Sequence, residues 1–289
     1  MTGFLLQLGA PLQSWGEHSA FTDRDTVAYP TRSGLIGMVA SALGIPRAET
    51  VTDPAAGSSL SPDSFADLRG LRFTVRIDRP GTRLVDFHTV GGGYPHHRTV
   101  PTAKGARRSP DAATIVSRRH YLSDAVFTVA VTGPGLDPAR LGQYAAALAA
   151  PHWPLHLGRR SCPPSGLLLV RAAVPDPVAE LDRVPLARPA PRGNGSREAG
   201  EPEATVEVRF TADTPFPQQP GSPPSSRTAV TMLNDEPVRH GVRDRVHQAR
   251  PSYTTSRLLP ASLCAGYGIE YLEALANYLN EVPTGGTPS

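Results

Sequence analysis

The chain has 289 residues, 39% of them hydrophobic and 19% charged, which is enough for one large domain or two small ones with a core. It contains 31 prolines and 27 glycines, so long loops or linkers are expected beside that core. No apolar run approaches the roughly 18 residues of a membrane span, and the apolar start lacks the length and basic flank of a secretory signal. The two cysteines, Cys162 and Cys264, form no disulfide framework and favour a reducing cytoplasm.

The hydrophobic pattern predicts a strand, a helix and a second strand in the first part of the chain. Residues 4–8 are expected to be a strand, and a helix then begins at Thr31 to Ser33 and ends at Gly44. Residues 48–67 are expected to be a surface loop. Apolar and polar side chains alternate over residues 71–78, which is the period of a half-buried strand.

A third strand, a second helix and a fourth strand follow. Residues 125–131 alternate as a strand, Asp137-Pro138 supplies a cap and a first helical proline, and residues 166–174 form a further strand. This order predicts an α+β fold of the ferredoxin-like kind, which is RRM-like and has the split βαβ arrangement. Many unrelated proteins use that fold, so it implies no function by itself.

The second and third strands are separated by about forty residues, and segments of that length are usually functional or disordered. Residues 81–120 are basic: they contain Arg83, Arg98, Lys104, Arg107, Arg108, Arg118 and Arg119 against Asp86 and Asp111. A local basic surplus is typical of a nucleic-acid contact, and a solvated loop is the alternative. Because residues 91–93 are all glycine, we expect a projecting arm.

The remaining third of the chain is less regular. Residues 176–202 are rich in Pro, Ala and Gly and are expected to be a linker after a first domain at 1–175. Residues 203–289 are expected to be a small β-rich C-terminal extension. It contains one strand at 206–210, a poorly ordered stretch at 215–226 and a helix at 269–279.

Five stretches resemble a known family in their order and spacing. They are GAPLQSWG at 9–16, RDT at 24–26 leading to PTRSGLIG at 30–37, DFHTV at 86–90, YLSDA at 121–125 and LGRRSCP at 157–163. Together they resemble the CasD family, the type I-E form of the fifth CRISPR-associated protein family, within the RAMP superfamily. The resemblance covers residues 1 to about 175 and becomes loose after Val178.

The resemblance implies a ferredoxin-like RAMP domain with a long basic thumb, at about residues 81–120, between its second and third strands. It implies a non-catalytic subunit that clamps the 5′ handle of the guide RNA in a type I-E Cascade complex for antiviral defence. The implied neighbours are the CasC backbone and the CasA large subunit, with CasB and CasE as further candidates and target DNA met indirectly. No cofactor and no membrane partner are implied.

Three features of the residues fit RNA binding. The helix start at 31–34 offers backbone N–H groups and a positive dipole end, and Arg32 adds charge; an ordinary capped helix is the alternative. Arg159 and Arg160 follow Gly158 on a turn, where arginines can bind phosphate with two hydrogen bonds; a turn paired to carboxylates is the alternative. Trp15 can stack on a base, with burial in the core as the alternative, and Cys162 is expected to be a small buried residue.

The candidate RNA-binding residues are Gln13, Trp15, Arg24, Thr31, Arg32, Ser33, Gly34, His88, Lys104, Arg107, Arg108, Arg118, Arg119, Tyr121, Arg159 and Arg160. No catalytic and no metal-binding residue is assigned. The aromatic signature of a standard RNA-binding sheet is missing from both central strands, so recognition is expected to rest on the arm, the helix start and the arginine turn.

An endoribonuclease is the alternative function. The type I-C relatives of this superfamily cleave repeat RNA and look to use a tyrosine, a lysine and a histidine. The corresponding candidates here are His88, Tyr94, His96, His97 and Lys104. A metal hydrolase using His88, His96 and His97 is a third hypothesis, but no HExxH or carboxylate-rich spacing supports it.

Overall fold

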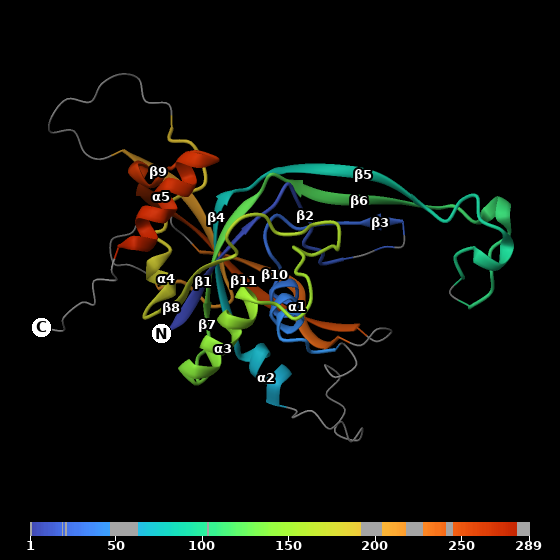
Figure 1. The fold of residues 1–289 in the computed structure, drawn as a ribbon, viewed down its shortest axis with the longest axis horizontal. Coiled ribbons are helices and arrows are strands. Elements are labelled where there is room, and N and C mark those ends of the chain that lie inside the picture. The colour runs from blue at the N-terminus through green and yellow to red at the C-terminus, as the bar shows by residue number, and fades with distance from the viewer. Residues whose placement is uncertain are drawn as a thin grey trace, which may run out of the picture.

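In the residues that the structure describes, two largely antiparallel sheets and five helices make up a mixed α/β fold (Figure 1). The computed structural model describes residues 2–18, 20, 22–46, 63–102, 104–191, 204–217, 228–240 and 245–281. The larger sheet has seven strands in the order β10-β11-β9-β4-β7-β1-β8, and every neighbouring pair is antiparallel. In the smaller sheet β6 pairs with β2, β3 and β5.

The strands of the larger sheet are β1 (Gly3–Gly9), β4 (Arg72–Arg79), β7 (Val126–Thr132), β8 (Leu169–Val174), β9 (Thr205–Ala212), β10 (Ala229–His240) and β11 (Arg245–Pro260). Those of the smaller sheet are β2 (Leu12–Gln13), β3 (Asp23–Arg24), β5 (Thr82–Val90) and β6 (Ile115–Ser123). The helices are α1 (Arg32–Ala42), α2 (Asp63–Gly70), α3 (Pro138–Ala149), α4 (Pro177–Glu180) and α5 (Ile269–Asn280). Short 3-10 turns lie at His96–Arg98, Pro110–Ala112 and Ala261–Leu263.

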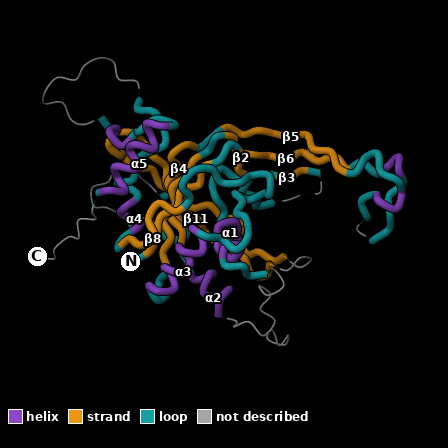
Figure 2. The backbone as a smooth tube through the Cα atoms, viewed as in Figure 1, coloured by secondary structure: helices purple, strands orange, loops and turns teal. Residues whose placement is uncertain are grey.

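The central strands are buried on both faces because helices cover both sides of the larger sheet (Figure 2). In β1, Phe4 and Leu6 join the core beneath α1, α2 and α3, while Leu5 joins the core beneath α4 and α5. Successive side chains of a strand point to opposite faces, so a strand between two helical layers is apolar throughout. Within the described residues, no helix combines the length and apolarity needed to cross a membrane.

The structure confirms most of the predicted elements. β1, β4, β7, β8 and β9 lie where strands were expected, and α1, α3 and α5 lie where helices were expected. The cap of α3 is as predicted, since the Asp137 side chain accepts a hydrogen bond from the Ala139 N–H at 2.9 Å. The loop expected at 48–67 is interrupted by α2, which begins at Asp63; residues 48–62 lie outside the described part.

The expected linker at 176–202 is wrong over its first half. Leu181, Val184 and Leu186 are fully buried in the core beneath α5. The segment is also fixed by the buried Arg76, whose guanidinium donates to the carbonyls of Val184 and Pro185 at 2.7 and 3.0 Å. Residues 192–202 lie outside the described part, so the prediction for them stays a prediction.

The C-terminal extension expected at 203–289 is β-rich as predicted, but its treatment as a unit beside the first domain is wrong. β9 pairs with β4 from Thr74↔Ala212 to Ile77↔Arg209, and β11 and β10 continue the same sheet beyond it. Residues 204–260 therefore extend the sheet begun by β1 and share its core, wherever the structure describes them. The stretch expected to be poorly ordered at 215–226 lies mostly outside the described part.

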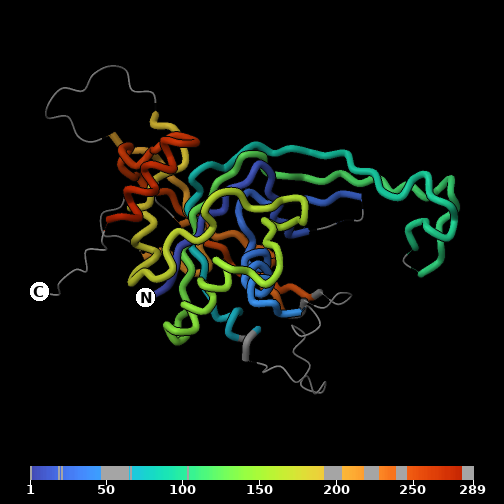
Figure 3. The backbone as a smooth tube through the Cα atoms, in the orientation of Figure 1, coloured from blue at the N-terminus to red at the C-terminus, as the bar shows by residue number. Residues whose placement is uncertain are grey.

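An arm formed by β5 and β6 runs away from the larger sheet (Figures 1 and 3). The two nine-residue strands pair along their whole length, from Thr82↔Ser123 to Val90↔Ile115. Among the described strands, β2 and β3 are the further partners of β6, and they pair with its part nearest the body, from Arg118 to Ser123. The arm is thus an ordered two-stranded ladder, and its strands were not predicted from the sequence.

Candidate nucleic-acid interface

One side of the arm's base carries arginines from three segments. Arg119 and Tyr121 alternate with Arg118 and His120 along β6, so the two sets point to opposite sides. Arg24 of β3 is in parallel register with Arg119 and shares its side. The Arg159 guanidinium lies 4.7 Å from the centre of the Tyr121 ring. We call Arg24, Arg119 and Arg159, with the adjoining exposed Arg160, the arginine face. The assignment of Tyr121 to the RNA-binding residues is wrong, because Tyr121 is only 5% exposed and supports Arg159 from below.

The opposite side of the arm's base is different in charge. His120 Nε2 lies 3.1 Å from Asp23 Oδ1, and the Arg83 guanidinium lies 3.3 Å from Asp25 Oδ1. Beyond these ion pairs the side carries the exposed Arg118 and the apolar Phe87, which is 68% exposed and in register with Arg118. The chain's own carboxylates compensate part of the positive charge on this side. On the arginine face, Asp86 stands opposite Arg119 in the β5–β6 register, but Arg24, Arg159 and Arg160 leave a local surplus of positive charge that can attract phosphate.

The arginine turn at 157–163 is packed against the loop that follows β2. Ser14 N–H donates to the Leu157 carbonyl at 3.1 Å, and Leu157 N–H donates to the Cys162 carbonyl at 2.7 Å. Gly158 has a φ of +90°, and a Cβ added there would lie 1.7 Å from the Ser14 carbonyl oxygen. Only glycine fits this turn, which fixes where the two arginines that follow it emerge.

The adjacent arginines of this turn have different surroundings. The Arg159 guanidinium donates to the carbonyls of His120 and Arg24 at 3.1 and 2.7 Å, so part of its donor capacity is used inside the protein. Arg160 is exposed. Cys162 is buried as predicted, and burial raises the pKa of its thiol.

The assignment of Gln13 and Trp15 to an RNA-binding surface is wrong. Trp15 is only 1% exposed, and its indole N–H donates to Gln13 Oε1 at 3.0 Å. The Gln13 amide in turn donates to the carbonyls of Leu8 and Ala125. Gly34 packs on the indole, since an added Cβ would lie 2.9 Å from that ring. Gln13 and Trp15 therefore support the surface from below and cannot touch a ligand, and the half-buried Gly34 serves the packing of Trp15.

The anion site expected at the start of α1 is also wrong, because the chain fills it itself. The Arg32 backbone N–H donates to Asp235 Oδ2 at 2.7 Å, so a carboxylate of β10 takes the place expected for a phosphate. The Arg32 side chain is buried and binds Asp213 at 2.7 Å and Glu236 at 2.5 Å. Thr31 is buried and Ser33 is half-buried at the same helix start, so neither offers an open site.

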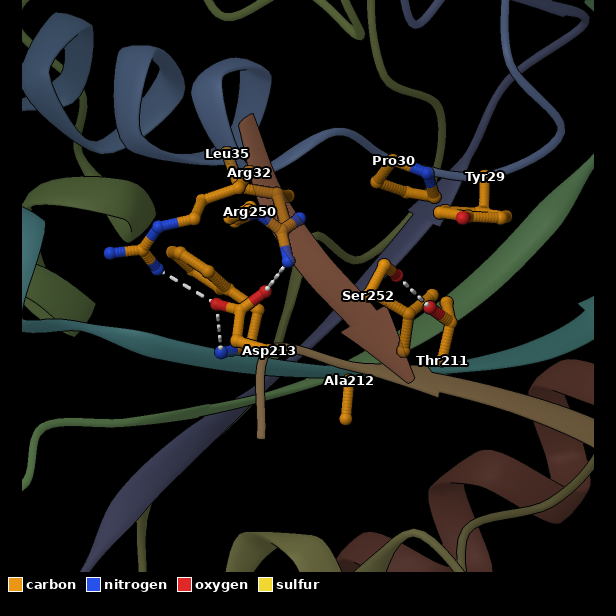
Figure 4. Close-up of a pocket in the computed structure, with 11 residues that line it drawn as sticks. Tyr29, Pro30, Arg32, Leu35, Thr211, Ala212, Asp213, Arg250 and Ser252 are labelled. Carbon is orange, nitrogen blue, oxygen red and sulfur yellow. Dashed lines mark hydrogen bonds and ion pairs between the residues drawn. The ribbon is translucent and has the colours of Figure 1, made fainter. Parts of the chain in front are cut away.

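Figure 4 shows how Asp213 joins the parts of this cluster. Its carboxylate accepts from Arg32, from Arg250 of β11 at 2.9 Å, and from the Phe73 backbone N–H at 3.0 Å. Burial raises the pKa of Asp213 and outweighs the opposing effect of Arg250 and Arg32. The acidic partners were missed because nothing in the sequence around them signals a contact with α1.

The remaining predicted residues lie along the arm, away from its base. His88 Nδ1 is 3.2 Å from Asp86 Oδ2 on β5, and the Arg107 guanidinium donates to the Thr99 carbonyl at 2.6 Å. Lys104, Arg107 and Arg108 belong to the segment between β5 and β6 at the far end of the arm (Figure 1). The predicted basic cluster therefore splits into the arginine face and this distal group, and Arg118 points away from both Arg119 and Tyr121.

No metal site is apparent in the described ranges: no three His, Cys, Asp or Glu side chains come together there. His96 and His97 lie on an exposed 3-10 turn of the arm.

Comparison with known proteins decides the family. The profile of a family described as CRISPR-associated protein (Cas_Cas5) matches residues 3–245. The chain belongs to this family. The matched range contains both the arm and the arginine turn, and the expected resemblance to the CasD family is confirmed.

Three relatives illustrate the similarity. The chain is 34% identical over 167 residues to the CRISPR system Cascade subunit CasD of Escherichia coli (strain K12), a match that spans 55% of this chain and 66% of that protein. It is 46% identical to a chain of a structure titled CRISPR RNA-guided surveillance complex, with a TM-score of 0.75 and coverage of 96% of this chain and 100% of that one. A structure titled Crystal structure of Cas protein is 27% identical with a TM-score of 0.55, covering 93% of this chain and 99% of that one.

Proposed function

We propose that the chain is an RNA-binding, non-catalytic subunit of a type I-E Cascade complex and holds the 5′ handle of the guide RNA on its arginine face. One observation carries the proposal: arginines from β3, β6 and the 157–163 turn gather on one side of the arm's base, while Asp23 and Asp25 pair with basic groups on the other. Relatives that are a Cascade subunit and part of an RNA-guided surveillance complex support the assignment.

The fold fits this role in a specific way. We propose that β1, α1, β4, β7, α3 and β8 form a ferredoxin-like unit, because the strands lie in the order β4-β7-β1-β8 and helices follow β1 and β7. The β5–β6 arm then corresponds to the thumb. CasC and CasA are the proposed neighbours, CasB and CasE further ones, target DNA is met indirectly, and the cytoplasm is the proposed location.

The non-catalytic part of the proposal rests on the surroundings of the candidate catalytic groups. His96 and His97 are exposed, and His88 lies 3.2 Å from Asp86, a carboxylate that can orient a histidine base but does not supply the acid for the leaving oxygen. General acid–base catalysis needs groups held within hydrogen-bond reach of the reacting atoms. Exposed side chains on an arm hold that geometry poorly.

Replacing Arg119 and Arg160 by alanine together is expected to weaken guide-RNA binding roughly a hundredfold, because each charged hydrogen bond contributes about 1.5 kcal/mol or more. The slope of log K against log salt should fall by about 1.4, since each contact with a single-stranded phosphate contributes about 0.7. Affinity is measured by fluorescence anisotropy of a labelled synthetic guide RNA at several salt concentrations.

Arg183→Ala is the control for this pair. Arg183 is 49% exposed next to α4, lies 3.5 Å from Glu180 and is on the side of the sheet covered by α5. Its loss removes one positive charge without touching the arginine face, so affinity and slope should stay near wild type. Equal effects of control and test variants contradict the site. Specific cutting of the RNA that disappears in His97→Ala contradicts the non-catalytic role.

A further inference from the structure

We propose that Arg159 is a positioning residue that holds β3 beside β6, and that Arg160 is the residue of this turn that contacts phosphate. This inference rests on the proposed RNA-binding role of the arginine face. It gives different roles to two adjacent arginines that the sequence alone does not distinguish.

Arg159 joins two strands through their backbones. One guanidinium nitrogen donates to the His120 carbonyl of β6 at 3.1 Å, and the other donates to the Arg24 carbonyl of β3 at 2.7 Å. Its planar group also lies against the Tyr121 ring. A planar fork with donors pointing in two directions suits two separate carbonyls, whereas the ammonium of a lysine is a compact point charge on a flexible stem.

Strand β3 is short, so side-chain hydrogen bonds to its backbone help to hold it beside β6. It consists of two residues in parallel register with Arg118 and Arg119, with one more backbone bond from Arg118 N–H to the Thr22 carbonyl at 2.8 Å. The Arg83 guanidinium donates to the Thr26 carbonyl just beyond β3. Other ties hold the same segment, including the ion pairs of Asp23 and Asp25 and the Val27 N–H bond to the Trp15 carbonyl. Arg159 is the tie that ends on the Arg24 backbone itself, so it fixes where the Arg24 side chain leaves β3.

Arg160 has none of these ties. It is exposed, and within the described ranges no hydrogen bond, ion pair or ring contact holds its side chain. A guanidinium with all five donors available is suited to a phosphate. The loss of Arg160 should therefore act independently of β3, whereas the loss of Arg159 should remove the contribution of Arg24 with it.

A double-mutant cycle on guide-RNA affinity tests the difference, using the full chain and a synthetic guide RNA. Arg24→Ala is expected to weaken binding about tenfold in the wild type but less than twofold when Arg159→Lys is already present. The fold-losses in affinity caused by Arg24→Ala and Arg160→Ala should multiply in the double variant, because the two residues make independent contacts. Arg159→Lys keeps the positive charge but loses the planar guanidinium. If the hydrogen bonds of the guanidinium to the two strands matter, Arg159→Lys should bind RNA as poorly as Arg159→Ala. If a phosphate contact of Arg159 matters instead, Arg159→Lys should bind nearly as well as wild type.

Additive effects of Arg159→Lys and Arg24→Ala, or near-wild-type affinity of Arg159→Lys, overturn the positioning role. A second readout needs no RNA: limited trypsin digestion should cleave after Arg24 several-fold faster in Arg159→Lys than in wild type, with Arg160→Ala unchanged. Unchanged cleavage also overturns it. Wild-type protein and Arg160→Ala could instead bind RNA equally weakly while trypsin still cleaves Arg159→Lys faster than wild type. That result contradicts the proposed RNA surface but supports the positioning role of Arg159.

Discussion

Gly158→Ala is expected to lower the free energy of unfolding by about 2–5 kcal/mol. The backbone at Gly158 has a φ of +90°, which residues with a Cβ rarely adopt, and the new Cβ would lie 1.7 Å from the Ser14 carbonyl oxygen. That oxygen belongs to a backbone tied to the same turn by the Ser14 N–H bond to Leu157, so it cannot easily move aside. Thermal unfolding should show a Tm lower by roughly 5–15 °C, at about 2–4 °C per kcal/mol.

Gly166→Ala is the control that separates the cost of the left-handed backbone from the cost of the steric clash with Ser14. Gly166 has a φ of +76°, but nothing lies within 4 Å of the position of an added Cβ. Only the conformational cost of about 1–2 kcal/mol is expected there. Equal losses in the two variants contradict the close packing of the arginine turn against Ser14. Guide-RNA affinity should fall with Gly158→Ala alone, because only that turn carries Arg159 and Arg160.

Arg32→Ala is expected to cost about 3–5 kcal/mol of stability, because removing one partner of a buried ion pair is strongly destabilising. Asp213 would keep Arg250 and Glu236 would keep Arg69 as charged partners, so the loss comes from the buried hydrogen bonds and charge that Arg32 supplies. Arg32 is 3% exposed and binds Asp213 and Glu236, besides donating to the Leu71 carbonyl at 2.7 Å. Chemical denaturation measures the loss. Below the unfolding transition the variant should bind guide RNA with a wild-type salt slope, since this guanidinium faces no solvent.

Arg140→Ala is the control at the surface. The Arg140 guanidinium is 42% exposed and lies 3.3 Å from Asp67. Exposed pairs of this kind contribute about 0–1 kcal/mol. If Arg32→Ala instead leaves stability unchanged and lowers the salt slope, the start of α1 is an anion site after all.

The fold was predictable where apolar side chains repeat with a clear period. β4 alternates and α3 opens with a cap and a proline, so both were found from the sequence. β5 contains residue types that are common in strands, but its side chains are largely exposed on both sides. Because neither face is buried, its sequence lacks the alternation of apolar and polar residues that marks a strand. The segment after Pro177 was misjudged because its proline content hides the apolar positions that α5 covers.

The candidate site shows a different limit of sequence reasoning. The helix start at Arg32 was located correctly, yet its role was wrong because Asp235, 203 residues further along the chain, already occupies it. Sequence spacing cannot reveal a partner at that distance. The sequence does not distinguish the two members of the pairs Arg118–Arg119 and Arg159–Arg160. In the structure, Arg118 and Arg119 point to opposite sides of β6, and Arg159 binds two strand carbonyls while Arg160 is exposed.

Photo-cross-linking of a guide RNA carrying 4-thiouridine in its 5′ handle, followed by mass spectrometry of the linked peptides, tests the central claim most directly. Cross-links are expected in residues 115–123 and 157–163, which carry the arginine face, with the RNA recovered at full length. Cross-links confined to β9, β10, β11 or α5 contradict the account.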